Sequence, residues 1–236
     1  MTMIMTIALL SMMFACTSEE TSIFWEGYLF QQSEEGMIAL EDATIEILNG
    51  SGDFLTSGEI PNGRPSNYQR LAMETEWLNQ PIGLRVGSPN SITMLWNGQS
   101  PSKDATWLPG GLFALEDSFG NAFLDSFANT VDVPLEGPVH LWGEPFRPEE
   151  WINVSIEIFD EDQEYPVYTF SQLSTGLIST SIDTGIDWFF AWNLPAKPLT
   201  LQVTLETGAV IQTQYAPQDG DILSALYYAL PQEDFE

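Results

Sequence analysis

Residues 199–215 read LTLQVTLETGAVIQTQY, and this stretch decides the fold class. Apolar and polar residues alternate strictly over 199–205, which is the period of a β-strand with one buried face. Thr207 and Gly208 supply turn chemistry, and a second strand-like run follows over 210–215. Two such runs around a short glycine-containing turn predict a β-hairpin. We therefore expect a mainly β fold.

Strand-like runs recur on both sides of this hairpin. Residues 152–158 (INVSIEI) alternate without error, and residues 187–192 (DWFFAW) form an apolar run expected at the centre of a sheet. Residues 222–230 fit a helix or a strand, and a strand is favoured because Gly220 precedes them and the chain around them is β. Further predicted strands cover 24–30, 43–48, 83–87, 91–96 and 139–142.

Residues 97–138 have a different pattern. Proline and glycine interrupt the chain at 101 and 109–111, and apolar residues then recur at steps of three and four. This spacing predicts an amphipathic helix that packs on a core, and a stripe that lines a cofactor is the alternative. Gly120 inside the helix costs about 1 kcal/mol of helix propensity. The apolar stripe consists of Leu112, Leu115, Phe119, Phe123 and Phe127.

The chain before residue 97 and the chain after residue 138 share a weak internal pattern. Each block has an opening aromatic strand, an alternating strand, a turn and a glycine-led strand. This order resembles the small seven-stranded sandwiches of carboxypeptidase-regulatory-like and transthyretin-like domains. The matching segments are 25–27, 43–47 and 58–60 in the first block and 142–143, 154–158 and 176–178 in the second.

The resemblance implies two small antiparallel β-sandwich modules joined by a partly helical connector. The first module would cover residues 23–96, the connector residues 97–138 and the second module residues 139–236. No enzymatic activity comes with this resemblance.

Residues 1–16 read MTMIMTIALLSMMFAC, and Cys16 is the single cysteine of the chain. The apolar run is shorter than the roughly 20 residues that cross a bilayer, and Ala15 supplies the small residue expected at a cleavage point. Polar residues follow at once, so the segment resembles the signal peptide and lipobox of a bacterial lipoprotein. The resemblance implies a signal peptide over 1–15, a diacylglyceryl group on Cys16 and a tether over 16–22.

Two other interpretations of Cys16 remain open. The chain could be a secreted protein without lipid, or the apolar run could be a core strand or helix that carries a free thiol. The lipoprotein interpretation is preferred because lipidation accounts for an odd cysteine. It places the protein in the bacterial cell envelope, and Thr17 after the cysteine favours the outer membrane over the inner one. The whole chain also resembles acidic lipoproteins of myxobacteria and their relatives.

The charge balance is strongly acidic, with 34 Asp and Glu against 6 Lys and Arg and a formal net charge of −28. Such a surface repels phosphate backbones, which excludes nucleic-acid partners. It also repels anionic lipid headgroups, so contact with a membrane would come through the lipid anchor. Solubility explains the charge most simply, and a cation-binding surface or docking to a basic partner are the alternatives.

The sharpest acidic cluster is the run DEDQE at residues 160–164. Asp160, Asp162 and Glu164 place carboxylates at alternate positions, which suits Ca²⁺, an ion that takes about 6–8 oxygen ligands. The EF-hand pattern fails because glycine and glutamate are missing from its sixth and twelfth positions. A solvated hairpin loop is the simpler interpretation, and a calcium loop of another type is the alternative.

Other patterns that could carry chemistry are weak. His140 is the single histidine, and no Gly-x-Ser-x-Gly elbow accompanies it, so we expect a structural role. Carboxylate pairs of the glycosidase type are not excluded, but nothing in the sequence selects two of the many acidic residues. Four tryptophans lie near predicted loops or edges, where they could stack on sugars, although burial is their commoner fate. These are Trp77, Trp96, Trp107 and Trp151.

We therefore expect a non-enzymatic cell-envelope lipoprotein with a structural or binding role. Its partner would be a protein or a glycan, and its one attached group would be the covalent lipid. A Ca²⁺-dependent binding module and a hydrolase with a carboxylate pair are the alternatives.

Overall fold

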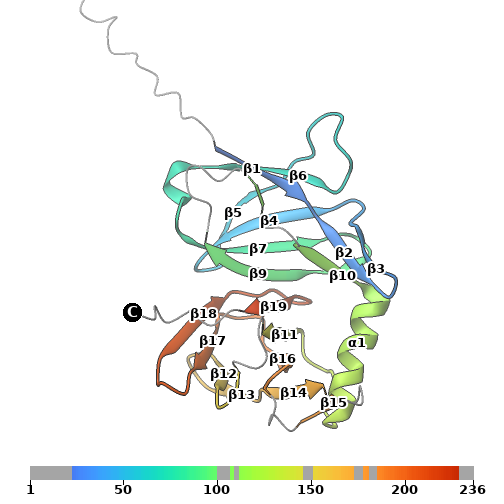
Figure 1. Cartoon of the computed structure of the whole chain (residues 1–236). Coiled ribbons are helices and arrows are strands. Elements are labelled where there is room, and N and C mark those ends of the chain that lie inside the picture. The colour runs from blue at the N-terminus through green and yellow to red at the C-terminus, as the bar shows by residue number, and fades with distance from the viewer. Residues whose placement is uncertain are drawn as a thin grey trace, which may run out of the picture.

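The computed structural model describes residues 23–99, 107–108, 112–145, 151–172, 178–180 and 185–228. Cys16, the expected signal peptide and the expected tether lie outside the described residues. Within the described ranges the chain is mostly strand, and one α-helix, α1 (Asp117–Thr130), follows the strands of the N-terminal half in the chain and runs along the side of the C-terminal half (Figure 1). The prediction of a mainly β fold is confirmed.

The N-terminal half, residues 23–99, supplies nine strands and one short 3₁₀ helix to the described structure. They are β1 (Ile23–Tyr28), β2 (Phe30–Ser33), β3 (Gly36–Ala39), β4 (Thr44–Asn49), β5 (Phe54–Ser57), β6 (Tyr68–Met73), η1 (Thr75–Trp77), β7 (Pro81–Gly87), β8 (Ser91–Ile92) and β9 (Met94–Gln99).

Strand β10 (Phe113–Glu116) leads into α1, and the C-terminal half, residues 139–228, follows. Its described strands are β11 (Val139–Pro145), β12 (Ser155–Phe159), β13 (Glu164–Tyr165), β14 (Tyr168–Gln172), β15 (Ile178–Ser179), β16 (Trp188–Leu194), β17 (Leu199–Thr204), β18 (Val210–Tyr215) and β19 (Ile222–Tyr228).

A nine-stranded sheet runs through both halves, in the order β15-β14-β16-β11-β19-β9-β7-β4-β5. The last strand, β19, lies between β11 and β9 and is parallel to both (Figure 1). The two halves therefore share backbone hydrogen bonds. Most strand pairs are antiparallel as expected, but these two pairs and the β2–β10 pair are parallel.

Smaller sheets cover this sheet and complete the sandwich. Strands β1 and β6 form a two-stranded sheet whose inner residues, such as Trp25 and Leu71, pack on Ile45 and Val86 of the large sheet. The sheet β13-β12-β17-β18 packs in the same way on the C-terminal half, and the sheet β3-β2-β10-β8 lies beside α1. In the C-terminal half the large sheet is buried on both faces: Phe189 of β16 packs toward the β12–β17 sheet, and its neighbour Phe190 packs toward α1.

The hairpin that the sequence predicts at 199–215 is present as β17 and β18, and Gly208 has the positive φ of 85° that its turn requires. Strand β12 begins at Ser155 rather than at residue 152, because Asn153 has a φ of 58°, which extended backbone does not allow. Residues 222–228 form a strand, as favoured from the sequence.

The predicted helical stripe is only partly helical. Leu112 precedes β10 and Leu115 belongs to it, so the helix begins at Asp117. The phenylalanines pack on the large sheet: the ring centroid of Phe127 lies 4.6 Å from that of Phe190, and that of Phe123 lies 4.8 Å from that of Trp142. The stripe is therefore a core-packing face.

Candidate functional site

The acidic loop at 160–164 closes the β12–β13 hairpin around Asp160. Its carboxylate accepts hydrogen bonds from the backbone N–H groups of Asp162 and Gln163, at 2.7 and 3.0 Å, and one from the Tyr165 hydroxyl. Lys197 Nζ lies 2.9 Å from Asp160 and 3.0 Å from Asp162. The Tyr165 hydrogen bond, reinforced by Lys197, holds the pKa of the Asp160 carboxyl well below its usual range.

The structure thus brings Asp160 and Asp162 together around an ammonium group. Glu164 lies on β13 with its side chain exposed. A Ca²⁺ ion between the two aspartates would have to displace Lys197. In the part of the chain that the structure describes, no group of three or more His, Cys, Asp or Glu side chains has the arrangement of a metal site, and the calcium hypothesis stays a prediction.

His140 and the four tryptophans lie in different places. His140, on β11, is half-buried, and its Nδ1 accepts a hydrogen bond from the backbone N–H of Asn193 at 3.4 Å. Burial lowers the pKa of its imidazole. Trp151 is buried and stacks on Phe189, whereas Trp107 is 67% exposed. Trp77 and Trp96 are half-buried beside hollows described below.

A buried ion pair joins the two halves of the chain. Arg85 of β7 donates hydrogen bonds from Nη2 and Nε to Asp221 Oδ1, at 2.9 and 3.2 Å, and from Nη1 to Glu46 Oε2 at 2.9 Å. The Asp221 side chain has no exposed surface, and its Oδ2 accepts the backbone N–H of Gln218 at 2.8 Å. Burial raises the pKa of Asp221, although Arg85 acts in the opposite direction.

Sequence reasoning missed this pair. Asp219, Gly220 and Asp221 look like an ordinary turn, and Gly220 does have a φ of 89°. The sequence did contain one signal for the pair. Arg85 is a charged residue in the middle of an apolar strand, and a buried arginine is rarely found without an acidic partner.

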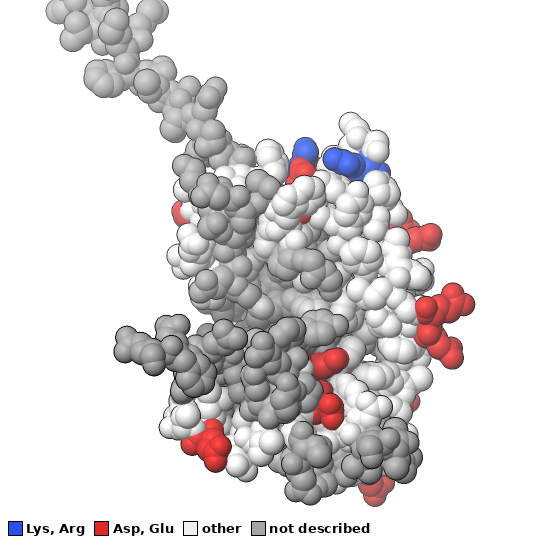
Figure 2. All heavy atoms as spheres, viewed as in Figure 1, with Lys and Arg blue, Asp and Glu red and all other residues white. Residues whose placement is uncertain are grey.

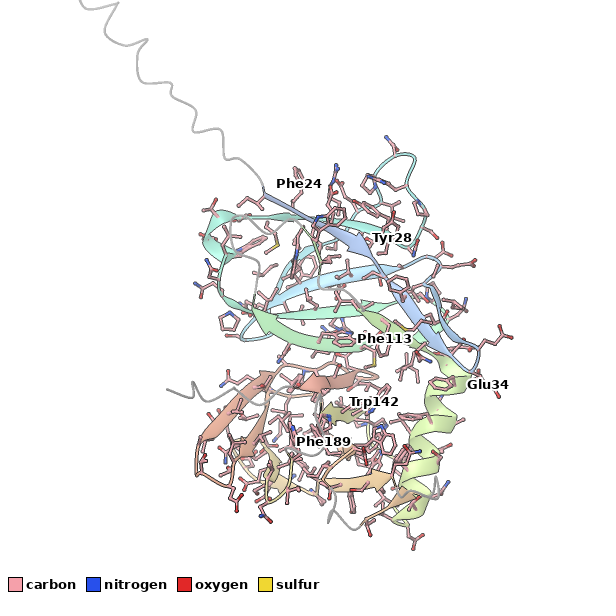
Figure 3. All side chains as sticks on the ribbon, viewed as in Figure 1. Phe24, Tyr28, Glu34, Phe113, Trp142 and Phe189 are labelled. Carbon is pink, nitrogen blue, oxygen red and sulfur yellow. The ribbon has the colours of Figure 1, made fainter. Side chains whose placement is uncertain are left out.

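The outer surface of the β1–β6 sheet is aromatic and basic. Phe24 and Tyr28 point outward from β1 and are 41% and 44% exposed (Figure 3). The guanidinium of Arg70 lies over the Phe24 ring at 5.0 Å, and that of Arg64 lies over the Tyr68 ring at 4.5 Å. We call Phe24, Tyr28, Arg64 and Arg70 the aromatic–arginine face.

This face stands out from the rest of the visible surface. In Figure 2 the basic side chains gather at the end of the molecule that carries β1 and β6, whereas acidic side chains are spread over other elements. Glu26, between Phe24 and Tyr28, accepts hydrogen bonds from Tyr68 and Arg70, and these bonds lower its pKa. Glu26 therefore stays ionised, and its charge and that of Arg70 largely offset each other. The alternation of Phe24, Glu26 and Tyr28 along a strand was the sequence signal for this face.

A groove opens where the halves meet, and we call it the junction groove. It holds a hollow of about 500 Å³, which is within the range of small-molecule sites. Its walls come from the turn after β4, the start of β7, β9, the end of β18 and the middle of β19. None of the described residues that line this hollow is charged. They include Asn49, Gly50, Pro81, Trp96, Gln212 and Gln214.

A second hollow of about 550 Å³ lies nearer η1, and Glu76 is among the residues that line it. The two hollows share Asn49, Gly50, Pro81 and Ile82, and the second is also lined by Trp77. Of the four tryptophans named from the sequence, Trp77 lines the second hollow, whereas the Trp96 ring packs against Phe113.

A third hollow, of about 820 Å³, lies at the start of α1 and is acidic. Glu34, Glu35 and Glu116 line it, and Figure 3 shows Glu34 extending from the β2–β3 turn. A general acid of a glycosidase would need a raised pKa. Among the residues that the structure describes, the carboxyl groups with a pKa raised by burial are Asp221 and Glu144, and neither lines the three hollows described here.

Comparison with known proteins gives no family for this chain: no family model matches the sequence, and no curated protein matches it significantly. Across the described ranges, no helix has both the length and the apolar character needed to cross a membrane.

Proposed function

We propose that this chain is a non-enzymatic lipoprotein of the bacterial cell envelope, anchored through a diacylglyceryl group on Cys16, with a binding role. The observation that carries the proposal is the position of the aromatic–arginine face. Phe24 lies two residues after the end of the expected tether at residue 22, so this face begins where the tether would end.

The length of the expected tether supports a position of the aromatic–arginine face near the membrane. Residues 16–22 would span at most about 25 Å if fully extended, at roughly 3.3–3.6 Å per residue. A lipid on Cys16 would therefore hold β1 close to the bilayer surface. Aromatic rings and arginines with long apolar stems are the side chains suited to that interface.

The net charge supports a covalent anchor over a reversible one. A chain with a net charge of −28 is repelled by anionic headgroups. The few exposed aromatic side chains would bind a bilayer weakly by themselves. Two acyl chains give stable attachment, and a diacylglyceryl group provides them.

A binding role fits the interactions of three ionisable groups. Asp221 is held by Arg85, Asp160 by Lys197 and Tyr165, and His140 accepts a backbone hydrogen bond. A general base must lie within hydrogen-bond reach of the substrate proton that it removes. The three groups named here form hydrogen bonds within the protein instead.

Metabolic labelling with an alkyne fatty acid tests the anchor. The full-length chain is expressed in a bacterium beside a known lipoprotein, and a Cys16→Ser variant serves as the matched control. We expect label on the wild-type chain and none on the variant. An unlabelled wild-type chain beside a labelled reference lipoprotein refutes the proposal.

A further inference from the structure

We propose that the aromatic–arginine face, together with Trp107, contacts the surface of a zwitterionic phospholipid bilayer. The contact would hold the folded chain against the membrane as a second, non-covalent attachment beside the lipid on Cys16. This inference rests on the anchor proposed above and names the partner of the face. It is carried by the aromatic rings on one side of the β1–β6 sheet, by the balance of charge there and by the short tether to Cys16.

Trp107 extends the face along the edge of β1 that is turned away from β6. Glu26 pairs with Arg70 of β6 across one edge of β1 and with Trp107 across the other. The Leu108 N–H, which donates a hydrogen bond to the Glu26 carbonyl at 2.7 Å, holds this second pairing. Residues directly opposite each other in neighbouring strands project to the same side, so Trp107 lies on the outer side with Glu26. Leu108, the next residue, is buried in the core beneath.

Three aromatic side chains are therefore exposed on one side of this small sheet. Trp107 is 67% exposed, Tyr28 is 44% exposed and Phe24 is 41% exposed, whereas Trp25 between the strand positions of Phe24 and Tyr28 points inward. Figure 3 shows Phe24 and Tyr28 along the outer strand β1. Large apolar side chains gathered on one surface mark a contact site, and Trp and Tyr are enriched where a membrane meets water.

The charge of the face suits a zwitterionic surface. Arg70 is paired with Glu26, and Glu59 lies opposite Arg70 on the other edge of β6. With Arg64, these groups give two positive and two negative charges, so the centre of the face is close to neutral although the chain carries −28. Arginine can bond phosphate oxygens of lipid headgroups while its stem lies on apolar surface. A basic protein partner would instead favour the elements on which Figure 2 shows acidic side chains.

The tether favours a bilayer over a soluble partner as the occupant of this face. Residues 16–22 span at most about 25 Å at roughly 3.3–3.6 Å per residue, and β1 follows them directly. A short flexible linker keeps the groups at its two ends at an effective concentration in the millimolar range. A contact too weak to hold a free protein on a membrane would therefore be occupied in the anchored one.

Coupling the full-length chain to vesicles through its thiol tests the contact. Cell-free synthesis gives the chain with Cys16 unmodified. Because Cys16 is the single cysteine, a maleimide lipid in phosphatidylcholine vesicles attaches the chain at that position alone. The vesicles are made with or without brominated acyl chains, which quench indole fluorescence at close range. Residues 1–15 contain no tryptophan, so insertion of that segment does not contribute to the signal.

We expect brominated vesicles to reduce the tryptophan emission of the coupled wild-type chain. Trp107→Phe keeps an aromatic ring but removes the exposed indole, so it should abolish this loss of emission. Phe24→Ser should remove most of the loss, because it takes an apolar ring out of the contact. Val210→Ser is the matched control: Val210 is 53% exposed on β18 in the other half of the chain, and its substitution should leave the loss unchanged.

Three results would overturn the proposal: emission that brominated vesicles do not reduce, a loss that persists in Trp107→Phe, or a loss that Phe24→Ser leaves unchanged. A dimer in solution that Phe24→Ser dissociates, measured by light scattering before coupling, would also overturn it and assign the face to a second copy. Circular dichroism establishes that each variant folds. The chemical coupling does not depend on lipidation by a cell, so a failure of the anchor and a failure of the contact are separate results.

Discussion

Replacing Arg85 by methionine tests whether a buried charge pair holds the two halves together. The substitution keeps a long apolar stem but removes the guanidinium that contacts Asp221 at 2.9 and 3.2 Å. Asp221 has no exposed side-chain surface, so it would be left buried without a counter-charge. We expect a clear loss of stability at neutral pH.

The structure sets the size of this loss. Removing one partner of a buried ion pair costs about 3–5 kcal/mol. The lower end applies here, because the Gln218 N–H at 2.8 Å still donates to Asp221. A loss of about 3 kcal/mol lowers the melting temperature of a chain of this size by roughly 6–12 °C.

The loss should depend on pH in a defined direction. Burial raises the folded-state pKa of Asp221 above the ordinary value of 3.8, and Arg85 limits that rise. Without Arg85 the pKa rises further, so the folded variant takes up a proton at a higher pH than the unfolded chain does. The variant therefore regains stability as the pH falls through this raised pKa, and the cost of Arg85→Met is largest at high pH.

Urea unfolding of both proteins between about pH 8 and pH 5 measures this cost. Burial lowers the pKa of His140, but His140 is present in both proteins and its contribution cancels in the difference. Arg70→Met is the control, because its pair with Glu26 is partly exposed and should cost about 0–1 kcal/mol. A cost for Arg85→Met that equals the control, or that does not shrink with falling pH, refutes the reasoning.

Three further predictions concern packing and calcium. Gly143→Ala should lower the free energy of unfolding, measured in urea, by about 1–3 kcal/mol, because a Cβ on residue 143 would overlap the buried ring of Phe189. An unchanged urea midpoint would contradict this close contact between Gly143 and Phe189. Gly120→Ala should not give the gain of about 1 kcal/mol expected from helix propensity, since its Cβ would lie 2.7 Å from Ile92 Cδ1 and 3.0 Å from Leu115 Cβ; the full gain in urea unfolding would contradict this close packing. Millimolar Ca²⁺ should leave the wild-type melting temperature unchanged while Lys197 occupies the acidic loop, and a rise in the wild type would show that the ion displaces it.

The periodicity of the sequence predicted most strands but not their partners. The hairpin at 199–215 was predictable because both strands and their turn are adjacent in the chain. The position of β19 was not, because its neighbours Leu95 and Leu141 are far away in the sequence and its apolar pattern fits any central strand. Parallel pairing between distant segments leaves no local signature.

The candidate site was predictable only as residue types. Trp77 and Trp96 were named as sugar-stacking candidates among four tryptophans, and nothing in the sequence separated them from Trp151, which is buried. The acidic cluster at 160–164 was found, but Lys197 was not, since that residue lies on a different connection of the sheet. For the tryptophans and for the acidic cluster alike, the environment of the side chain depends on contacts between segments that are far apart in the sequence.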